Sequence, residues 1–415
     1  MTAPIPAIPP RHHNRVTALL DEVTAWRRDL HAHPEIGFEE VRTSGIVAGK
    51  LRDFGVDEVI QGLARTGVVG IIRGRADGPM IGLRADMDAL PMPDHKTVAH
   101  RSTLANRMHG CGHDGHTAML LGAAKVLCDT RDFAGSVAVI FQPAEEGLGG
   151  GREMVEDGLF ERAPCASVWG LHNWPGVALG SFVALDGPVM AGVDYFDIRI
   201  RGKGAHAGMP HEGVDTVLAA CHIVTAFQSV ASRNVPPHAA VAIAVPRFRG
   251  ATAYHVLPDE TEIGGSVRYF DAAVRETMEQ RLRALATQIA IGFGAEAEID
   301  YRRNYPPTVN HSAETAVAAE VAGGLVGREN VVRSCPLCMA AEDFSFMLNQ
   351  RPGHYIWMGV DQPGHTDAKL HHPDYDFNDA AIPYGIGYWL GLVDRLLPAH
   401  QQGSESRLTR FDAED

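Results

Sequence analysis

The sequence predicts an α/β protein whose larger domain has a mixed, largely parallel sheet and carries a smaller α+β domain inserted into it. A chain of 415 residues exceeds what one hydrophobic core usually holds. Short β-rich runs alternate with helical stretches near both ends, whereas the strands between them alternate polar and apolar residues. We therefore expect the larger domain at 11–189 and 304–400, and the inserted domain at 190–303.

The larger domain begins with two expected helices between residues 11 and 53. Apolar residues recur there at helical spacing, and a His-Pro-Glu segment at 33–35 interrupts them. Because proline disfavours helical backbone in the residue before it, we expect the two helices to separate at this segment. We expect the proline-rich residues 1–10 and the polar tail 401–415 to stay outside the core.

The strands expected next are short apolar runs bounded by Gly, Pro or Asp. They are 68–72, 80–83, 136–141, 166–171 and 355–360. Continuous apolar runs are typical of strands buried on both faces, as in parallel sheets covered by helices. A helix expected at 117–128 supplies part of that cover.

The inserted domain begins with an alternating segment at 194–201, which predicts a half-exposed strand. The elements expected after it are a helix at 214–231, an irregular strand pair at 240–245 and 261–269, a helix at 273–293 and a strand at 296–301. Together these elements form a βαββαβ unit.

The charge balance excludes two classes of partner. Lys and Arg number 37 against 51 Asp and Glu, which gives a formal net charge of −14. Such a chain repels phosphate backbones and anionic lipid headgroups, so we expect no nucleic acid and no membrane partner. The chain shows neither a long uncharged apolar run nor a signal-type start, and its six cysteines are too sparse for a disulfide scaffold. We therefore expect a cytoplasmic protein.

The densest cluster of reactive side chains is Met-His-Gly-Cys-Gly-His-Asp-Gly-His at 108–116. Cys111 and His113 stand in a glycine-rich loop, where a thiolate and an imidazole can reach the same one or two metal ions. A glycine-rich connector capped by Asp114 accounts for the Asp and Gly residues but not for Cys and His together. His116 falls on the first helical turn, where packing explains it as well as a site role does.

Two adjacent carboxylates, Glu145 and Glu146, follow the expected strand 136–141. In open α/β sheets, ligands bind at the carboxyl ends of strands. Neighbouring residues outside a helix point in different directions, so one carboxylate can bind a cation while the other stays a free base. Taken alone, paired Glu residues are also typical of a solvated turn.

Histidines at two further strand ends repeat this pattern. His172 closes one apolar run, and His371 with His372 follows the last expected strand. Cys, His and Glu donors at several strand ends suit two divalent transition metals with a bridging water. Asp86 and Asp88 follow another expected strand, where such carboxylates serve either as ligands or to orient a ligating His, and we expect the second role for Asp88. Arg268 ends a strand of the inserted domain, where a guanidinium can bind a carboxylate in a bidentate manner.

Eight motifs together resemble a known family. They are HAHPEIGFEE (31–40), RADMDALPM (84–92), MHGCGHDGHTAMLLGAA (108–124), FQPAEEG (141–147), GLHNWP (170–175), GKGAHAGMPHEGVD (202–215), AAEDF (340–344) and LHHPDYDFND (370–379). In this order they resemble the di-metal amidohydrolases that include hippurate hydrolases, N-acyl-amino-acid amidohydrolases and plant auxin-conjugate hydrolases. The resemblance extends from about residue 15 to 397.

The resemblance implies an α/β catalytic domain with an inserted lid domain that also dimerises, and hydrolysis of the amide bond of a small N-acyl amino acid. It implies that Cys111 bridges two divalent ions, drawn from Mn, Zn, Co and Ni. The remaining ligands that it implies are His113, Glu146, His172 and His371. By the same resemblance, Glu145 is the general base, and His206 reaches from the lid of the same or a partner subunit to polarise the scissile carbonyl. A homodimer or homotetramer follows from this picture.

Two positions depart from the family pattern. His255 stands where the family often has Asn, so its contacts to the substrate carbonyl or carboxylate are expected to differ. His372 directly follows His371, which leaves open which of the two is the ligand.

A dipeptidase or an aromatic-amine deaminase on the same metal site is an alternative function, as is a non-catalytic metal binder. The pair Glu145 and Glu146 argues against the last, because a metal binder needs no free base.

Overall fold

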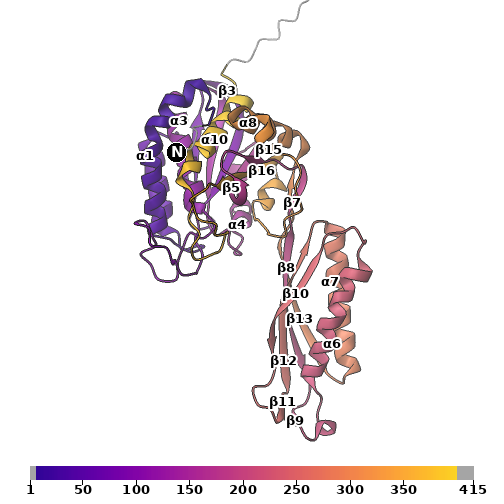
Figure 1. The fold of residues 1–415 in the computed structure, drawn as a ribbon. Helices are drawn as coiled ribbons and strands as arrows, with labels where there is room; N and C mark the ends of the chain where they lie inside the picture. The colour runs from indigo at the N-terminus through magenta and orange to yellow at the C-terminus, as the bar shows by residue number, and fades with distance from the viewer. Residues whose placement is uncertain (1–5, 400–415) are drawn as a thin grey trace, which may run out of the picture.

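The computed structural model describes residues 6–399, which form a large lobe and a long, narrow smaller lobe (Figure 1). An eight-stranded sheet runs through the large lobe. Its strands, in spatial order, are β1 (Glu58–Leu63), β2 (Gly67–Arg73), β4 (Ala134–Gln142), β3 (Ala76–Asp86), β5 (Ser167–Ala178), β16 (Gly353–Asp361), β6 (Phe182–Val183) and β15 (Val331–Val332). The central neighbours β4, β3, β5 and β16 are parallel, and antiparallel pairs flank them.

Helices cover both faces of this sheet. The helices on one face are α1 (Pro10–Ala32), α2 (Val41–Asp53), α3 (His113–Thr130), α8 (Ser312–Val326) and α10 (Ile382–Leu396). The short helices on the other face are α4 (Gly150–Glu156), α5 (Leu159–Arg162) and α9 (Ser345–Leu348). Strand β4 feeds both cores, because Val137 and Val139 face one and Ala138 and Ile140 face the other.

The predicted helix pair at the start of the chain is confirmed, since Pro34 lies in the turn between α1 and α2. The expectation that residues 1–10 stay outside the core is wrong at Ile8, which is 4% exposed and packs in the core of the large lobe. The Ala7 N–H donates to a carbonyl of α8, which holds this segment against the helix. The predicted polar tail 401–415 lies outside the described residues.

The smaller lobe is a four-stranded antiparallel sheet with two helices on one face (Figure 1). Its elements, in chain order, are β8 (Gly192–Arg201), α6 (Thr216–Ser229), β10 (Ala242–Arg249), β12 (Glu260–Tyr269), α7 (Ala272–Gly292) and β13 (Glu296–Tyr305). The period-two pattern of β8 buries Phe196, Ile198 and Ile200 under the helices and leaves Arg199 and Arg201 exposed. The predicted fold class, a mixed and largely parallel sheet with an inserted α+β domain, is confirmed.

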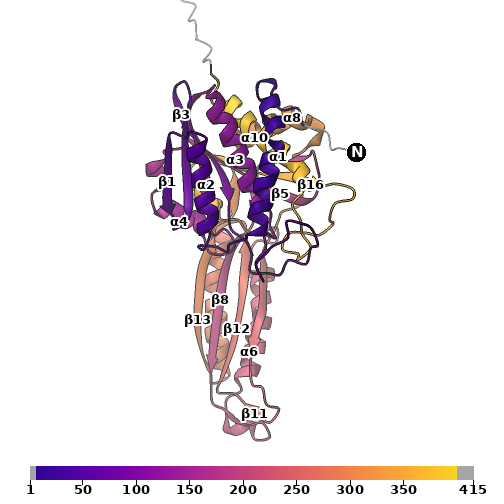
Figure 2. The same cartoon turned by 90° about the vertical axis from the view of Figure 1, so that its left-hand side faces the viewer.

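Short strand pairs lie at the two ends of the smaller lobe. Next to the large lobe, β7 (Gly187–Met190) pairs with β14 (Thr308–Asn310). At the opposite end, β9 (Ala205–His206) pairs with β11 (Val256–Leu257). We call this far end the tip. Strands β8, β12 and β13 run the length of the lobe between these ends (Figure 2).

Candidate metal centre

Four chain segments bring the candidate ligands together beside the parallel strands. Cys111 lies in the loop that enters α3, and His113 is the first residue of that helix. Between them, Gly112 has a φ of +92° and lies against Asn173, where a Cβ atom would come within 2.2 Å of the amide oxygen. Only glycine fits this approach and this backbone, so the glycine-rich sequence is required for the loop to reach β5. His172 lies on β5 itself.

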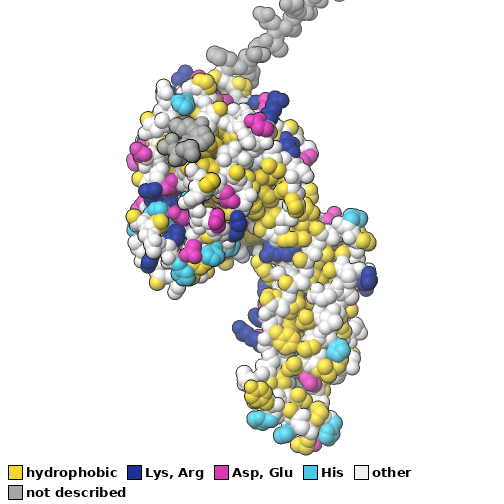
Figure 3. Space-filling view, in the orientation of Figure 1, with side chains coloured by type: hydrophobic (Ala, Val, Ile, Leu, Met, Phe, Trp, Pro, Cys, Tyr) yellow, Lys and Arg dark blue, Asp and Glu magenta, His cyan; other side chains and the backbone are white. Residues whose placement is uncertain are grey.

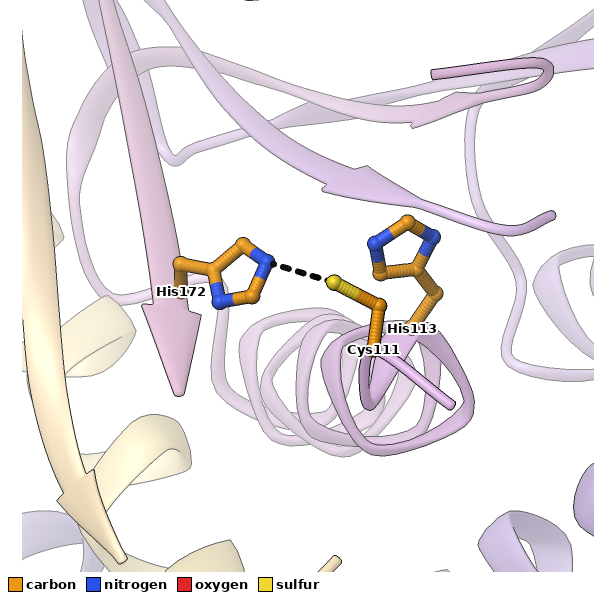
Figure 4. A group of neighbouring side chains, drawn as sticks. All are labelled: Cys111, His113 and His172. Carbon is orange, nitrogen blue, oxygen red and sulfur yellow. Dashed lines mark hydrogen bonds between the residues drawn. The ribbon is translucent and has the colours of Figure 1, made fainter. Parts of the chain in front are cut away.

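One donor group consists of Cys111, His113 and His172. All three side chains are buried, and one ligand atom from each lies within 4.8 Å of the other two. The Sγ atom of Cys111 is 3.4 Å from Nε2 of His172. Figure 4 shows the two rings on either side of the sulfur.

A second donor group consists of Cys111, Glu146 and His371, again with ligand atoms within 4.8 Å. Nε2 of His371 is 3.2 Å from Oε1 of Glu146, without hydrogen-bond geometry. His371 has a φ of +64°, a strained conformation of the kind that clusters at functional sites. Cys111 belongs to both groups, so its sulfur lies where two ions would meet.

The donor atoms fit divalent metal ions. Within residues 6–399, Nε2 of His113 and Oε1 of Glu146 are buried without a hydrogen-bond partner. The second nitrogen of each buried histidine is held from behind: Nδ1 of His113 is 3.2 Å from Asp88, and Nδ1 of His172 is 2.7 Å from the Asn173 carbonyl. This arrangement, one nitrogen fixed and the other free, is typical of metal-ligating histidines.

The charge states show what an ion would supply. Burial raises the pKa of the Cys111 thiol, and the neighbouring Glu146 and Glu145 carboxylates raise it further. Burial also lowers the pKa of His172 well below its usual range, so its ring is neutral and able to ligate. A bound cation reverses the first effect, because it stabilises the thiolate.

Asp88 connects the two loops that carry these ligands. One carboxylate oxygen faces Nδ1 of His113 at 3.2 Å, and the other accepts the backbone N–H of Glu146 at 2.9 Å. The contact to His113 is the one that sequence reasoning expected of Asp88. Glu40 supports the same loop by accepting the N–H of Ala144, which has a φ of +54°.

Glu145 differs from its neighbour Glu146. Its carboxylate makes no hydrogen bond with any of the described residues, and it lines the pocket beside the donor groups. Burial raises the pKa of Glu145 well above its usual value, and the Glu342 carboxylate adds to that. The Tyr305 hydroxyl donates to the Glu145 carbonyl at 2.7 Å, which fixes the backbone of this residue.

The pocket has a volume of about 590 Å³ and lies between the two lobes. Its lining residues are Leu90, Cys111, Glu145, Glu146, Gly147, His172, Trp174, Met190, Val193, Tyr195, Arg268, Tyr305, Ala340, Ala341, Glu342, Leu370 and His371. Arg268 comes from β12 and donates to the Met339 carbonyl at 3.1 Å. It forms no ion pair with any carboxylate among residues 6–399, so its charge is available to a ligand.

Two predicted site residues lie far from this pocket within the chain. His206 and His255 are exposed at the tip, where His206 pairs with Val256 and the Ala207 N–H donates to the His255 carbonyl. In Figure 1 the tip is at the opposite end of the smaller lobe from the large lobe, and histidine side chains gather there in Figure 3. One chain therefore brings these two histidines together but not to the metal donors.

Two further histidines of the motifs, His116 and His372, make hydrogen bonds outside the two donor groups. Nδ1 of His116 is 2.5 Å from Asp86, and its Nε2 accepts the Asn173 N–H at 3.1 Å. The ring of His372 accepts the Asp374 N–H at 3.2 Å, whereas its neighbour His371 faces Glu146.

Sequence reasoning missed a buried charge cluster beneath the pocket. Arg84 is fully buried and donates to the carboxylates of Asp86, Glu342 and Asp343 at 2.7, 2.9 and 3.2 Å. Oxygens of Glu342 and Asp343 lie within 4.8 Å of Glu145. The available signal was the adjacent acidic pair in the AAEDF motif, which has the same form as the pair at 145 and 146.

The fold and the donor set place this chain among the metallohydrolases, and comparison with known proteins gives the family. The model of peptidase family M20/M25/M40 matches residues 82–395. IAA-amino acid hydrolase ILR1-like 4 of Arabidopsis thaliana is 37% identical over 383 residues, covering 91% of this chain and 86% of that protein. Hippurate hydrolase of Campylobacter jejuni is 36% identical over 387 residues, covering 92% of this chain and 100% of that protein.

A solved structure agrees with this assignment. The Bacillus subtilis YXEP protein, described as a dinuclear metal-binding peptidase from the M20 family, superimposes with a TM-score of 0.78 at 32% identity. The match covers 92% of this chain and 99% of that one. The chain therefore belongs to peptidase family M20/M25/M40 and is a hydrolytic enzyme. Within residues 6–399, none of the helices is long and apolar enough to cross a membrane.

Proposed function

We propose that this protein hydrolyses the amide bond of N-acyl amino acids. The observation that carries the proposal is the position of Cys111 in both donor groups, beside a pocket that also holds Glu145, whose carboxylate has no hydrogen bond within residues 6–399, and Arg268, whose guanidinium has no carboxylate partner there. Hydrolysis of an amide that carries a free carboxylate needs three features: a pair of metal ions, a base and a cationic anchor. The names of the Arabidopsis and Campylobacter relatives describe hydrolysis of such conjugates.

The five residues proposed to hold two divalent ions, of Mn, Zn, Co or Ni, are Cys111, His113, Glu146, His172 and His371. When bound, the ions supply Lewis-acid chemistry at the carbonyl and lower the pKa of the attacking water. Asp88 keeps the His113 ring oriented with its free nitrogen toward the ions. His371 rather than His372 takes the last position, because only His371 faces Glu146.

Glu145 is the proposed general base. Its side chain lies in the pocket without a hydrogen-bond partner among the described residues, and the positive charge of bound ions would offset its raised pKa and leave a carboxylate that can accept a proton from the attacking water. The same carboxyl then donates that proton to the leaving amine, which requires no second acid. The Tyr305 hydroxyl holds the backbone of Glu145 in place during both transfers.

Arg268 is the proposed anchor for the substrate carboxylate, because it reaches the pocket from β12 and has no acidic partner in residues 6–399. Since β12 belongs to the smaller lobe, binding of the substrate joins the two lobes across the pocket. Such bridging favours closure and excludes bulk solvent from the pocket, apart from the attacking water.

His206 and His255 are proposed to act on a partner subunit. Both are exposed at the tip and distant from the metal donors of their own chain. We take the smaller lobe as residues 190–303. In a homodimer, the tip of this lobe in one subunit reaches the pocket of the other subunit. His206 then donates a hydrogen bond to the developing oxyanion, and His255 contacts the carbonyl or the carboxylate.

The six unpaired cysteines fit a reducing cytoplasm.

The test is a screen of N-acyl amino acids and dipeptides against the protein stripped with a chelator and reloaded separately with Mn, Zn, Co or Ni. We expect amino acid release from hippurate-like amides in the reloaded samples and none in the stripped protein. Hydrolysis of dipeptides alone would replace the proposal by the dipeptidase alternative. Turnover that survives complete metal removal would refute the metal mechanism.

A further inference from the structure

Two tryptophans stack beside the candidate metal centre. The rings of Trp174 and Trp357 are inclined by only 5°, with centroids 4.0 Å apart. Trp357 is 4% exposed on β16, whereas Trp174 is half-buried and lines the pocket. The stack covers one face of the Trp174 ring and holds it in one orientation, so its exposed part forms a rigid aromatic wall.

This wall adjoins the reacting centre. The ring of Trp174 meets the ring of His172 edge to face, with centroids 5.9 Å apart and planes at 76°. The Nε2 atom of His172 faces Sγ of Cys111 and belongs to the same donor group. Because Trp174 lines the same pocket as Cys111 and His172, a substrate carbonyl held at this donor group would place one of its substituents beside Trp174.

The two sides of an N-acyl amino acid meet different parts of the pocket. Arg268 offers the uncommitted positive charge, which suits the carboxylate on the amino-acid side. The acyl side carries no charge and matches a wall of indole and aliphatic side chains, such as Leu90 and Met190. A ring already fixed by Trp357 loses little conformational entropy when a ligand packs on it.

We propose that Trp174 is a specificity-determining residue, which stacks on a planar aromatic acyl group and favours it over a saturated ring of the same size. The proposal rests on the proposed function and adds the acyl preference to it. Aromatic pairs contribute attraction beyond their buried area, which corresponds to a preference of roughly 2- to 10-fold.

The first experiment compares two glycine conjugates that differ only in aromaticity. Benzoylglycine and cyclohexanecarbonylglycine are hydrolysed by the metal-loaded wild type, Trp174→Phe and Trp174→Leu. We expect kcat/KM to favour benzoylglycine roughly 2- to 10-fold in the wild type, less in the Phe variant, and not in the Leu variant. Leu90→Ala is the matched control, because trimming an aliphatic wall changes both substrates by the same factor.

The second experiment measures binding without turnover. The same two conjugates are titrated calorimetrically into metal-loaded Glu145→Gln, with and without Trp174→Leu. Tighter binding of benzoylglycine that disappears with Trp174→Leu supports the stacking. If the wild type binds in this way but hydrolyses neither conjugate, the proposed function is wrong and the stacking stands. Hydrolysis with equal affinities for both conjugates, or no binding of either, overturns the stacking.

A third substrate pair checks the side on which the aromatic group binds. N-acetylphenylalanine and N-acetylcyclohexylalanine place the ring on the amino acid instead of the acyl group. We expect Trp174→Leu to leave the ratio of their kcat/KM values unchanged. A loss of preference confined to this pair would overturn the assignment of Trp174 to the acyl side.

Discussion

The metal donors of the large lobe and the histidine-bearing tip of the smaller lobe look alike in sequence but differ in structure. Both are short, glycine-rich segments that carry histidine. The loop at Cys111 and His113 is buried and meets β5, and the second ring nitrogen of His113 and of His172 faces a carboxylate or a carbonyl, which leaves the other nitrogen for a metal. His206 and His255 are exposed, and among the described residues only the Gly208 N–H donates a hydrogen bond to the His206 ring.

Burial with an oriented second nitrogen suits His113 and His172 to the metal binding that we propose, whereas the exposure of His206 and His255 suits residues that act on another molecule; His371 is exposed too, but it faces Glu146. A ligand must be held before the ion arrives, because a loose side chain pays conformational entropy on binding. A residue that serves a partner subunit must stay on the surface until the subunits meet. The following predictions test this contrast, from the largest expected effect to the smallest.

The largest effect is expected at the base. Glu145→Gln keeps the shape of the side chain but removes its proton acceptor, so kcat should fall by roughly 10³-fold. Both ions should remain, because the carboxylate of Glu146 is untouched. Metal analysis and turnover on the same preparation check this. Loss of both ions together with activity would make Glu145 a ligand.

At the tip, His206→Ala should lower kcat by roughly 10²-fold without changing metal content, since it removes an oxyanion donor. Mixing this variant with Glu145→Gln should restore about one quarter of wild-type activity, because half the dimers are mixed and each has one intact site. Turnover is measured after subunit exchange, which is followed by mass spectrometry of differently labelled chains. Exchange without recovery would show that the tip does not serve a partner.

The two adjacent histidines offer an internal comparison. His371→Ala should weaken metal binding by about 100-fold or more, beyond the range typical of groups that only orient a ligand. His372→Ala should change it by less than about 3-fold, because its ring accepts the Asp374 N–H instead. Calorimetric titration of Mn²⁺ into each stripped variant measures both. The reverse ranking would transfer the ligand role to His372.

The contrast between buried and exposed histidines extends to stability. Burial lowers the pKa of His354 on β16 to about 3. Its folded pKa is below the unfolded value, so only the unfolded chain gains a proton as the pH falls below about 6.5, and this stability is lost towards acid. His354→Gln should reduce the loss of unfolding free energy between pH 7 and 5 by about 2 kcal/mol.

Urea unfolding of the wild type and the variant at the two pH values checks this prediction. His211→Gln is the control for replacing a histidine by glutamine, because His211 is exposed at the tip. An unchanged slope in His354→Gln would mean that His354 titrates alike in both states.

The strands of the large sheet were predictable because their signal is local. Residues 136–141 form a continuous apolar run, and burial on both faces of β4 requires that pattern. Strand β1 was not predicted, because it lies at the sheet edge and its partly exposed face gives no apolar run. Ile8 was misjudged for a related reason: its burial depends on α8, which is distant in sequence.

The sequence by itself determined which side chains are candidates for the chemistry, since Cys, His and Glu in glycine-rich segments at strand ends are informative without coordinates. Only the tertiary structure decided how they associate. It placed Cys111 in two donor groups and Arg84 beneath the pocket. It also turned His371 toward Glu146 and His372 away from it. These facts depend on contacts between segments up to 260 residues apart in the chain, such as Cys111 with His371, and side-chain spacing along one segment carries no information about them.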